Sequence, residues 1–458
     1  MRPHVLVLAA LLLAGCAAPA PAAESPPASP GELRVGGALL HAGGAAGALS
    51  LVHLAEGERA DVTFPRDVLV LAPDGRLVPG GEPVTIRRGE IAQYLAPYGA
   101  TSVGVRIAAD GETRDETLAL GPLRPFVSGE RVVELMKVQE ERFAHRTPGH
   151  ENYSKAVAYF GEFFANLSYD VETFRTPLPD VKLPVAVGPS TQSVVSVLGY
   201  KRGLEQPDRY IVMGGHFDVV EQTTHGAFDN TGGTMAVLAL AEAFAKLNTS
   251  RSLVFAAWGG EEDGILGSQA WLAAHPELVP KIDLYVNFDV TGLAWPAPLV
   301  APASVVAATG PDGPVGDALA AHHRAVVADW MKLDAPFVYE GVGHGQLAGA
   351  GVNAQSDHTP FMARGIPVLF QFTQDIRAAF TLIHKEADTV ENMTAYALHG
   401  AEGVGRPLDE AQRREGDQAL ARSFETQMMA GFYLAVLTDH GAMSSRPASL
   451  PALANARS

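Results

Sequence analysis

The sequence contains a single cysteine and has fewer basic than acidic side chains. One cysteine cannot form an internal disulfide framework, and it excludes cysteine-rich zinc sites, so any metal must be held by histidine and carboxylate side chains. With 34 Lys and Arg against 51 Asp and Glu, the formal charge is −17 and no basic cluster is present. This balance argues against a nucleic-acid-binding protein, because such proteins neutralise phosphates with clustered Lys and Arg.

Long apolar runs are also missing. The stretch from Val5 to Leu13 is too short to span a bilayer. Since Arg2 precedes it and small residues follow it, residues 1–15 are predicted to be a signal peptide. The segment Leu13-Ala14-Gly15-Cys16 resembles the lipobox of bacterial lipoproteins, which implies that Cys16 becomes the lipidated first residue of the mature chain. An ordinary secretory signal with a chance cysteine is the alternative.

Both alternatives predict export. A lipid on Cys16 would tether the protein in the cell envelope, at the outer membrane on its periplasmic side or at the surface, with the anchor as the only membrane contact. Residues 16–32 are rich in Ala and Pro and are predicted to be an extended tether. The final segment, residues 441–458, is predicted to be a disordered tail.

Two folded regions are predicted between the tether and the tail. In residues 33–125, apolar Val103, Val105 and Ile107 alternate with polar positions, which is typical of strands and indicates a small β-rich domain. Residues 126–440 alternate helical and strand-like segments, which indicates an α/β domain with a mixed, largely parallel central sheet flanked by helices. Its expected strands are 210–213, 253–258, 284–288 and 367–372, and its expected helices include 153–167, 234–247 and a final helix over 424–437. A polar, helix-prone insertion is expected over 397–422, before that final helix.

Acidic and histidine residues follow several of these strands. His216 stands at the end of the first, where ligands of open α/β sheets collect, and Asp218 is near enough to accept its second imidazole N–H. Asp229 lies in a glycine-containing loop that opens a helix, and it suits either a helix N-cap or a carboxylate that bridges two cations.

The next strand is followed by Glu261 and Glu262 within a Gly-flanked acidic turn, and consecutive acids after a buried strand are costly unless they meet a cation or water. Asp289 follows another apolar strand, and His384 lies in a loop that leads into a helix. Each residue alone has an ordinary structural explanation. Together they place two histidines and several carboxylates at one edge of one sheet, which predicts a metal centre.

In order and spacing these motifs resemble the zinc exopeptidase family typified by bacterial leucyl aminopeptidase and glutamate carboxypeptidase, over about residues 128 to 440. The resemblance implies two Zn²⁺ ions, one held by His216 and Asp289 and one by Glu262 and His384, with Asp229 bridging both. It also implies that Asp218 supports His216, that the Asp229-Asn230 peptide is cis, and that Glu261 is the general base that acts on water at the metals.

The resemblance implies a peptide substrate and, as the preferred activity, an aminopeptidase. No obligate protein partner is evident from the sequence. The segment Ser356–Phe361 resembles the family's substrate-side loop, so His358 is a candidate substrate contact. The sequence departs from some members by having Ala354 and Gln355 where they use an oxyanion-stabilising tyrosine. His358 and Tyr339 are weak candidates for that role.

Three alternatives stay open. Glutaminyl cyclases have a similar set of residues but use a single zinc, so metal stoichiometry separates them from exopeptidases. Dizinc deacylases and carboxypeptidases with an inserted dimerisation domain space their HxD and bridging Asp further apart. A non-catalytic binding lipoprotein with the same fold would typically lose ligands, whereas this chain has all five together with Glu261.

Overall fold

The computed structural model describes most of the chain between residues 33 and 439. It divides the chain into two compact units, and the main boundary falls between Phe126 and Val127. The predicted signal peptide, Cys16, the tether and the tail lie outside the described residues. The described residues are 33–41, 44–51, 58–66, 68–74, 76–87, 90–97, 102–109, 111–119, 127–178, 193–245, 249–294, 306–311, 313–327, 337–339, 355–373 and 375–439.

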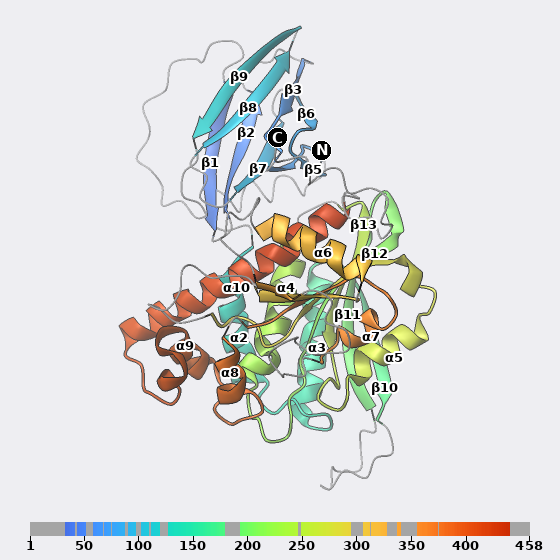
Figure 1. Cartoon of the computed structure of the whole chain (residues 1–458), viewed down its shortest axis with the longest axis vertical. Coiled ribbons are helices and arrows are strands. Elements are labelled where there is room, and N and C mark those ends of the chain that lie inside the picture. The colour runs from blue at the N-terminus through green and yellow to red at the C-terminus, as the bar shows by residue number, and fades with distance from the viewer. Residues whose placement is uncertain are drawn as a thin grey trace. The chain divides into compact units, whose positions relative to one another are not determined.

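The smaller unit consists of two antiparallel sheets, which are drawn in blue shades in Figure 1. One sheet has the order β1-β2-β7-β4-β5 and the other the order β6-β3-β8-β9. Both contribute to one apolar core, which includes Leu49 and Tyr94 from the first sheet and Val62 and Ile107 from the second. The strands are β1 (Leu33–His41), β2 (Gly44–Leu51), β3 (Arg59–Thr63), β4 (Leu69–Leu71), β5 (Leu77–Pro79), β6 (Pro83–Arg87), β7 (Ile91–Pro97), β8 (Ser102–Ala109) and β9 (Glu112–Ala119).

The alternation of apolar and polar residues along the strands produces this core. In β8, Val103, Val105 and Ile107 are buried while the residues between them are exposed, as expected for a strand with one face on a core. The β-rich character predicted for this region is therefore confirmed.

The larger unit is built on an eight-stranded sheet with the order β10-β11-β13-β12-β14-β17-β15-β16. Its four central strands, from β13 to β17 in that order, run parallel to one another, while the β10–β11, β11–β13 and β15–β17 pairs are antiparallel. The strands are β10 (Asp170–Pro177), β11 (Ser193–Lys201), β12 (Gln206–His216), β13 (Arg251–Trp258), β14 (Ile282–Phe288), β15 (Val306–Gly310), β16 (Phe337–Tyr339) and β17 (Val368–Gln371).

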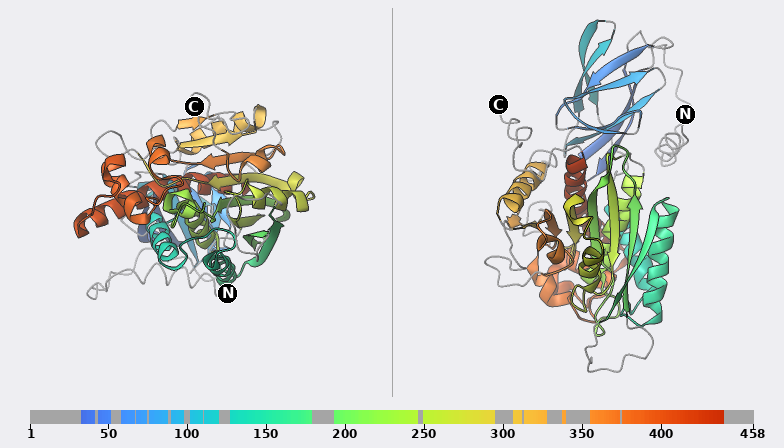
Figure 2. Two further views of the ribbon diagram at one scale, coloured as in Figure 1. Left: turned by 90° about the horizontal axis from the view of Figure 1, so that it is seen from below. Right: turned by 90° about the vertical axis from the view of Figure 1, so that its right-hand side faces the viewer.

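Helices lie on both sides of this sheet (Figures 1 and 2). They are α2 (Gly129–Arg142), α3 (Glu151–Asn166), α4 (Gly232–Ala245), α5 (Leu266–Ala274), α6 (Pro314–Ala325), α7 (Thr359–Met362), α8 (Ile376–Leu382), α9 (Val390–His399) and α10 (Glu410–Asp439), with short turns η1 (Ala227–Thr231), η2 (Val279–Lys281) and η5 (Gly400–Gly403). Within the described part of the chain, no helix has the length and apolarity needed to cross a membrane.

The two faces of the sheet have separate cores. On one face Trp258 and Tyr285 pack with Trp271 of α5 and Phe361 of α7. On the other face Gly199 leaves room for α3, since an added Cβ would lie 2.6 Å from the Phe164 ring. The predicted α/β class with a largely parallel centre is confirmed.

The C-terminal region differs from the prediction. We expected a polar, helix-prone insertion over 397–422 and a separate final helix over 424–437, but residues 410–439 form the single 30-residue helix α10. The change from polar to apolar residues near Phe424 reflects burial, not a helix boundary. Gly416 does not interrupt the helix, and it permits close contact with α9, because an added Cβ would lie 2.6 Å from Thr394.

A buried ion network ties together the amino-terminal ends of the central strands. Asp283 on β14 accepts from Arg209 Nε at 3.0 Å and from Arg251 Nε at 2.8 Å, and only 3% of its side chain is exposed. We expect Asp283→Ala to lower the free energy of unfolding by about 3 to 5 kcal/mol, because it removes one partner of a buried ion pair.

Chemical denaturation of the purified protein measures this loss. Glu151→Ala is the control, because its ion pair with Lys155 is solvent-exposed and should change the denaturation midpoint little. Equal midpoints for the two variants would contradict the prediction.

Candidate metal centre

Three neighbouring strands bring acidic and histidine residues to one edge of the sheet. His216 is the last residue of β12 and pairs with Trp258, the last residue of β13, so the turn that carries Glu261 and Glu262 begins beside it. On the other side Gly214 pairs with Asn287 of β14, which places Asp289 just beyond the same edge. Parallel alignment of these strands therefore gathers residues that are far apart in the sequence.

Two loops complete the cluster. Asp229 lies in η1, directly before α4, and its peptide bond to Asn230 is cis, as the resemblance implied. The start of α4, which follows this turn, packs closely against β14, since a Cβ on Gly233 would lie 2.2 Å from the Phe288 carbonyl oxygen. His384 lies between α8 and α9, with a φ of 57°.

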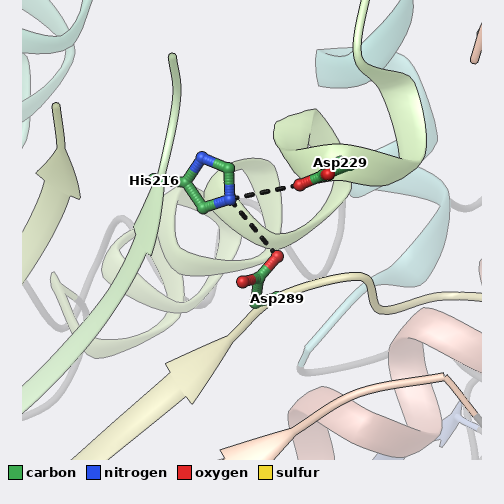
Figure 3. A group of neighbouring side chains, drawn as sticks. All are labelled: His216, Asp229 and Asp289. Atoms are coloured by element: carbon green, nitrogen blue, oxygen red, sulfur yellow. Dashed lines mark ion pairs between the residues drawn. The ribbon is translucent and has the colours of Figure 1, made fainter. Parts of the chain in front are cut away.

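The first group consists of His216, Asp229 and Asp289 (Figure 3). The His216 Nε2 atom lies 3.2 Å from Asp229 Oδ1 and 3.3 Å from Asp289 Oδ1. Figure 3 shows the imidazole nitrogen facing both carboxylates, which extend from the turn before α4 and from the end of β14.

The second group consists of Asp229, Glu262 and His384. His384 Nε2 lies 3.3 Å from Asp229 Oδ2 and 3.0 Å from Glu262 Oε2. Asp229 thus belongs to both groups and faces each with a different oxygen, which is the geometry required of a carboxylate that bridges two cations.

The residues fit zinc in donor type and spacing. Zinc is bound by imidazole nitrogen and carboxylate oxygen, and a tetrahedral ion with bonds of about 2.0 Å sets neighbouring ligand atoms about 3.3 Å apart. The separations of 3.0 to 3.3 Å in the structure match that value. Within the described residues, His216 Nε2, Asp289 Oδ1 and Glu262 Oε1 are also buried without a hydrogen bond, and a cation would satisfy all three.

Asp218 supports the site differently from the prediction. Its carboxylate oxygen Oδ1 lies 3.7 Å from His216 Nδ1, whereas its backbone carbonyl oxygen is nearer, at 3.2 Å. The carboxylate instead accepts from the backbone N–H groups of Glu261 and Glu262, at 3.3 and 3.2 Å. Asp218 therefore orients the acidic turn with its side chain, and the backbone carbonyl is the closer partner of the imidazole.

Glu261 lies beside the first group, with its Oε2 atom 4.0 Å from His216 Nε2, and with His216 and Glu262 it forms a third group that could hold a cation. Burial raises the pKa of Glu261 well above its ordinary value, and nearby carboxylates, led by Asp289 and Asp357, raise it further, while His216 opposes them. Asp357 is fully buried and was not selected from the sequence. Burial raises the pKa of Asp357 to about 7.

Among the other sequence candidates, the structure describes the side chain of His358. His358 is buried, stacks on the Phe370 ring at 4.2 Å between centroids, and belongs to none of the ligand groups found among the described residues. Its substrate-side position stays a prediction. The side chain of Tyr339 and the whole of Ala354 lie outside the described part of the chain.

Two further buried residues contact segments that carry the ligands, and the sequence did not suggest a role for either of them. Arg146 donates to the Phe217 carbonyl and to Thr231 Oγ1, both at 2.7 Å, and Asp388 accepts from the backbone of the Asp229 turn. The sequence offers one signal for Asp388. Thr389 follows it and is the N-cap of α9. The carboxylate of Asp388 is therefore not needed to cap that helix, which suggests another role for it.

The protonation of the histidines predicts how metal binding depends on pH. Hydrogen bonds to Asp229 and Glu262 raise the pKa of His384 to about 10 without metal. Burial alone would lower the pKa of His216, but facing carboxylates raise it well above its ordinary value. A cation must displace these protons, so we expect its affinity to fall about tenfold per pH unit, for each proton displaced, as pH decreases. Competition titrations with a chromophoric chelator between pH 6 and 8 measure this slope, and a constant affinity would contradict it.

Comparison with known proteins is consistent with the resemblance. Residues 196–404, which contain all the ligand candidates, match Peptidase family M28. A "Glutamate carboxypeptidase 2 homolog" from Caenorhabditis briggsae is 30% identical over 192 residues, which is 39% of this chain and 24% of that protein. The chain thus spans about a quarter of the length of this curated relative.

Two solved structures are similar at low identity. A zinc aminopeptidase from Bacillus subtilis has 15% identity and a TM-score of 0.46, and the match covers 66% of this chain and 95% of that chain. A glutaminyl cyclase from an Acidobacteriales bacterium has 15% identity and a TM-score of 0.44, with 67% and 94% covered.

Proposed function

We propose that this chain, which matches Peptidase family M28 over residues 196–404, is a zinc-dependent exopeptidase with two ions, and that it acts as an aminopeptidase. The single observation that supports this most is the position of Asp229, which faces His216 with one carboxylate oxygen and His384 with the other. His216 and Asp289 would hold one ion, Glu262 and His384 the other, and Asp229 both.

Zinc in such a site supplies Lewis acidity, which polarises a carbonyl and lowers the pKa of a water that it binds. The chain supplies the base. The assignment proposed above does not use Glu261 as a ligand, and its Oε2 atom lies 4.0 Å from His216 Nε2. From there it can accept a proton from the attacking water and return it to the leaving amine.

The rigidity of the acidic turn supports this division of labour. The Asp218 carboxylate accepts from the amides of both Glu261 and Glu262, so it fixes the two adjacent residues together. One glutamate then faces His384 while the other faces His216. A base held in this way needs no reorientation before it acts.

The charge of the surroundings supports an aminopeptidase. Besides the carboxylates of the two ligand groups, Asp218, Glu261 and Asp357 lie close enough to influence one another electrostatically. Counted against the four positive charges of two Zn²⁺ ions, these six carboxylates leave at most two negative charges in excess, which favours a substrate that presents a cationic amino terminus over one that presents a free carboxylate.

Activity assays test the proposal. The purified chain without its first 16 residues should hydrolyse amino-acid amides, lose this activity with a chelator and regain it with Zn²⁺. Hydrolysis confined to N-blocked peptides would overturn the aminopeptidase assignment, and no hydrolysis of any peptide would overturn the exopeptidase.

A single-zinc cyclase is the second candidate. Cyclisation of N-terminal glutamine with one zinc per chain would favour it. The grouping of Asp289 with His216 and Asp229 supports two ions, because a one-ion site at Glu262 and His384 would leave this group without a cation.

We further propose that Cys16 carries a lipid that anchors the enzyme in the cell envelope. In cells that process lipoproteins, the full chain should incorporate labelled palmitate and fractionate with membranes. Cys16→Ser should abolish the labelling and release the protein into the soluble fraction. Labelling of the serine variant, or none in the wild type, would contradict this proposal.

A further inference from the structure

We propose that Asp388 is a positioning residue that fixes the Asp229 turn relative to His384 and so sets the spacing of the two cations. The inference rests on the proposed dizinc function. It assigns a role to a buried acid that neither ligates in that scheme nor takes part in proton transfer.

Asp388 holds the turn through its backbone and its side chain. Its Oδ1 accepts from the Phe228 amide at 2.6 Å, and its Oδ2 accepts from the Asp229 amide at 3.0 Å. Its carbonyl oxygen accepts from the Ala227 amide at 3.3 Å. Three consecutive amides of the turn that carries the bridging carboxylate are therefore fixed by one residue.

The same residue belongs to the loop of the other ligand. His384 and Asp388 are four positions apart, and the Asp388 amide donates to the Lys385 carbonyl at 3.0 Å, which closes a turn between them. Movement of this loop would shift His384 and the Asp229 turn together. The Asp388 contacts thus preserve the 3.3 Å separation between His384 Nε2 and Asp229 Oδ2.

Arg146 provides the positive charge that a buried carboxylate requires. It is fully buried and donates to the Phe217 carbonyl, beside His216, and to Thr231, at the end of the Asp229 turn. Burial raises the pKa of Asp388, and the Arg146 charge opposes that rise. Arg146 therefore links the segment of the first histidine to the same turn that Asp388 fixes.

The chain contains a matched control for this arrangement. Asp439 at the end of α10 is also buried, and its carboxylate accepts from the consecutive amides of Ser250 and Arg251 at 3.0 and 2.6 Å. These amides lie at the start of β13, about 23 Å from its ligand-bearing end for a strand of this length. Asp439→Asn removes the same charge and the same kind of contact without touching a ligand loop.

The test compares metal binding by the wild type, Asp388→Asn and Asp439→Asn. Each protein is stripped of metal and titrated with Zn²⁺ against a chromophoric chelator, and with Co²⁺ by visible absorption. We expect Asp388→Asn to weaken at least one of the two ions by about 10- to 100-fold, as is usual for residues that orient ligands, and to change the Co²⁺ spectrum. Asp439→Asn should bind both ions as the wild type does.

The outcomes separate the two proposals. A wild type that binds two ions, with both variants equally affected or both unaffected, would overturn the role of Asp388 and leave the proposed function standing. A wild type that binds no ion would overturn both. Should Asp388→Asn not fold, Asp388→Glu decides: weakened binding by the misplaced carboxylate supports the role, and unchanged binding overturns it.

Discussion

Glu261→Gln is expected to retain two zinc ions and to lower kcat by about 10²- to 10⁴-fold, the usual contribution of a general base. Glutamine has nearly the same shape but cannot accept a proton at neutral pH. The KM should change little, because Glu261 is not needed as a ligand. Metal analysis and steady-state kinetics on an amino-acid amide measure both quantities.

Asp263→Asn is the matched control for this variant. Asp263 belongs to the same acidic turn, yet it is absent from the ligand groups found among the described residues. It should keep kcat within a few-fold of the wild type. Normal turnover by Glu261→Gln would remove the proposed mechanism, and loss of zinc from it would reassign Glu261 as a ligand.

Asp229→Asn is expected to have the largest effect of any single substitution at the centre. The amide retains one oxygen acceptor, but its nitrogen cannot replace the second oxygen, so one ion loses a ligand that it shares with the other. We expect the metal content to fall from two ions to one or none, and kcat/KM to fall by more than about 10³-fold, since the two ions act together.

Elemental analysis and kinetics at saturating Zn²⁺ measure these losses. Asp317→Asn, in the first turn of α6, replaces another acid by its amide and should retain both ions. Two tightly bound ions in Asp229→Asn would show that Asp229 does not bridge.

The sequence predicted the larger unit well because its central strands contain apolar runs, such as residues 253–258 of β13. All eight residues of β13 and all seven of β14 are buried, so strands covered on both faces stood out against their surroundings. Ligands at the ends of neighbouring parallel strands converge because of the sheet topology. This explains why the sequence alone predicted that His216 and Asp289 lie close together.

Features that depend on side-chain direction were harder to predict. The spacing of His216 and Asp218 suggested a contact between the imidazole and the carboxylate, but the carboxylate faces the amides of the acidic turn. An HxD motif fixes the distance between two residues along the chain. It does not fix which of several nearby donors the acid will accept from.

Buried supporting residues were not predictable for a similar reason. Arg146 is a single arginine in a loop, and besides the Phe143 carbonyl nearby its hydrogen-bond acceptors lie 71 and 85 residues away in sequence. No local pattern reports such contacts. The continuity of α10 was missed because its solvent-facing first half and buried second half differ in composition, although both are helical.

The ligands come from separate segments between His216 and His384, and an unfolded chain therefore has no preformed binding site for a cation. Zinc would bind only the native protein, and at a free concentration about 1,000-fold above its Kd each ion would add about 4 kcal/mol to the resistance to unfolding. Zinc starvation would then act first as a folding defect: the metal-free enzyme would be cleared by proteases, and its abundance would report the local zinc supply.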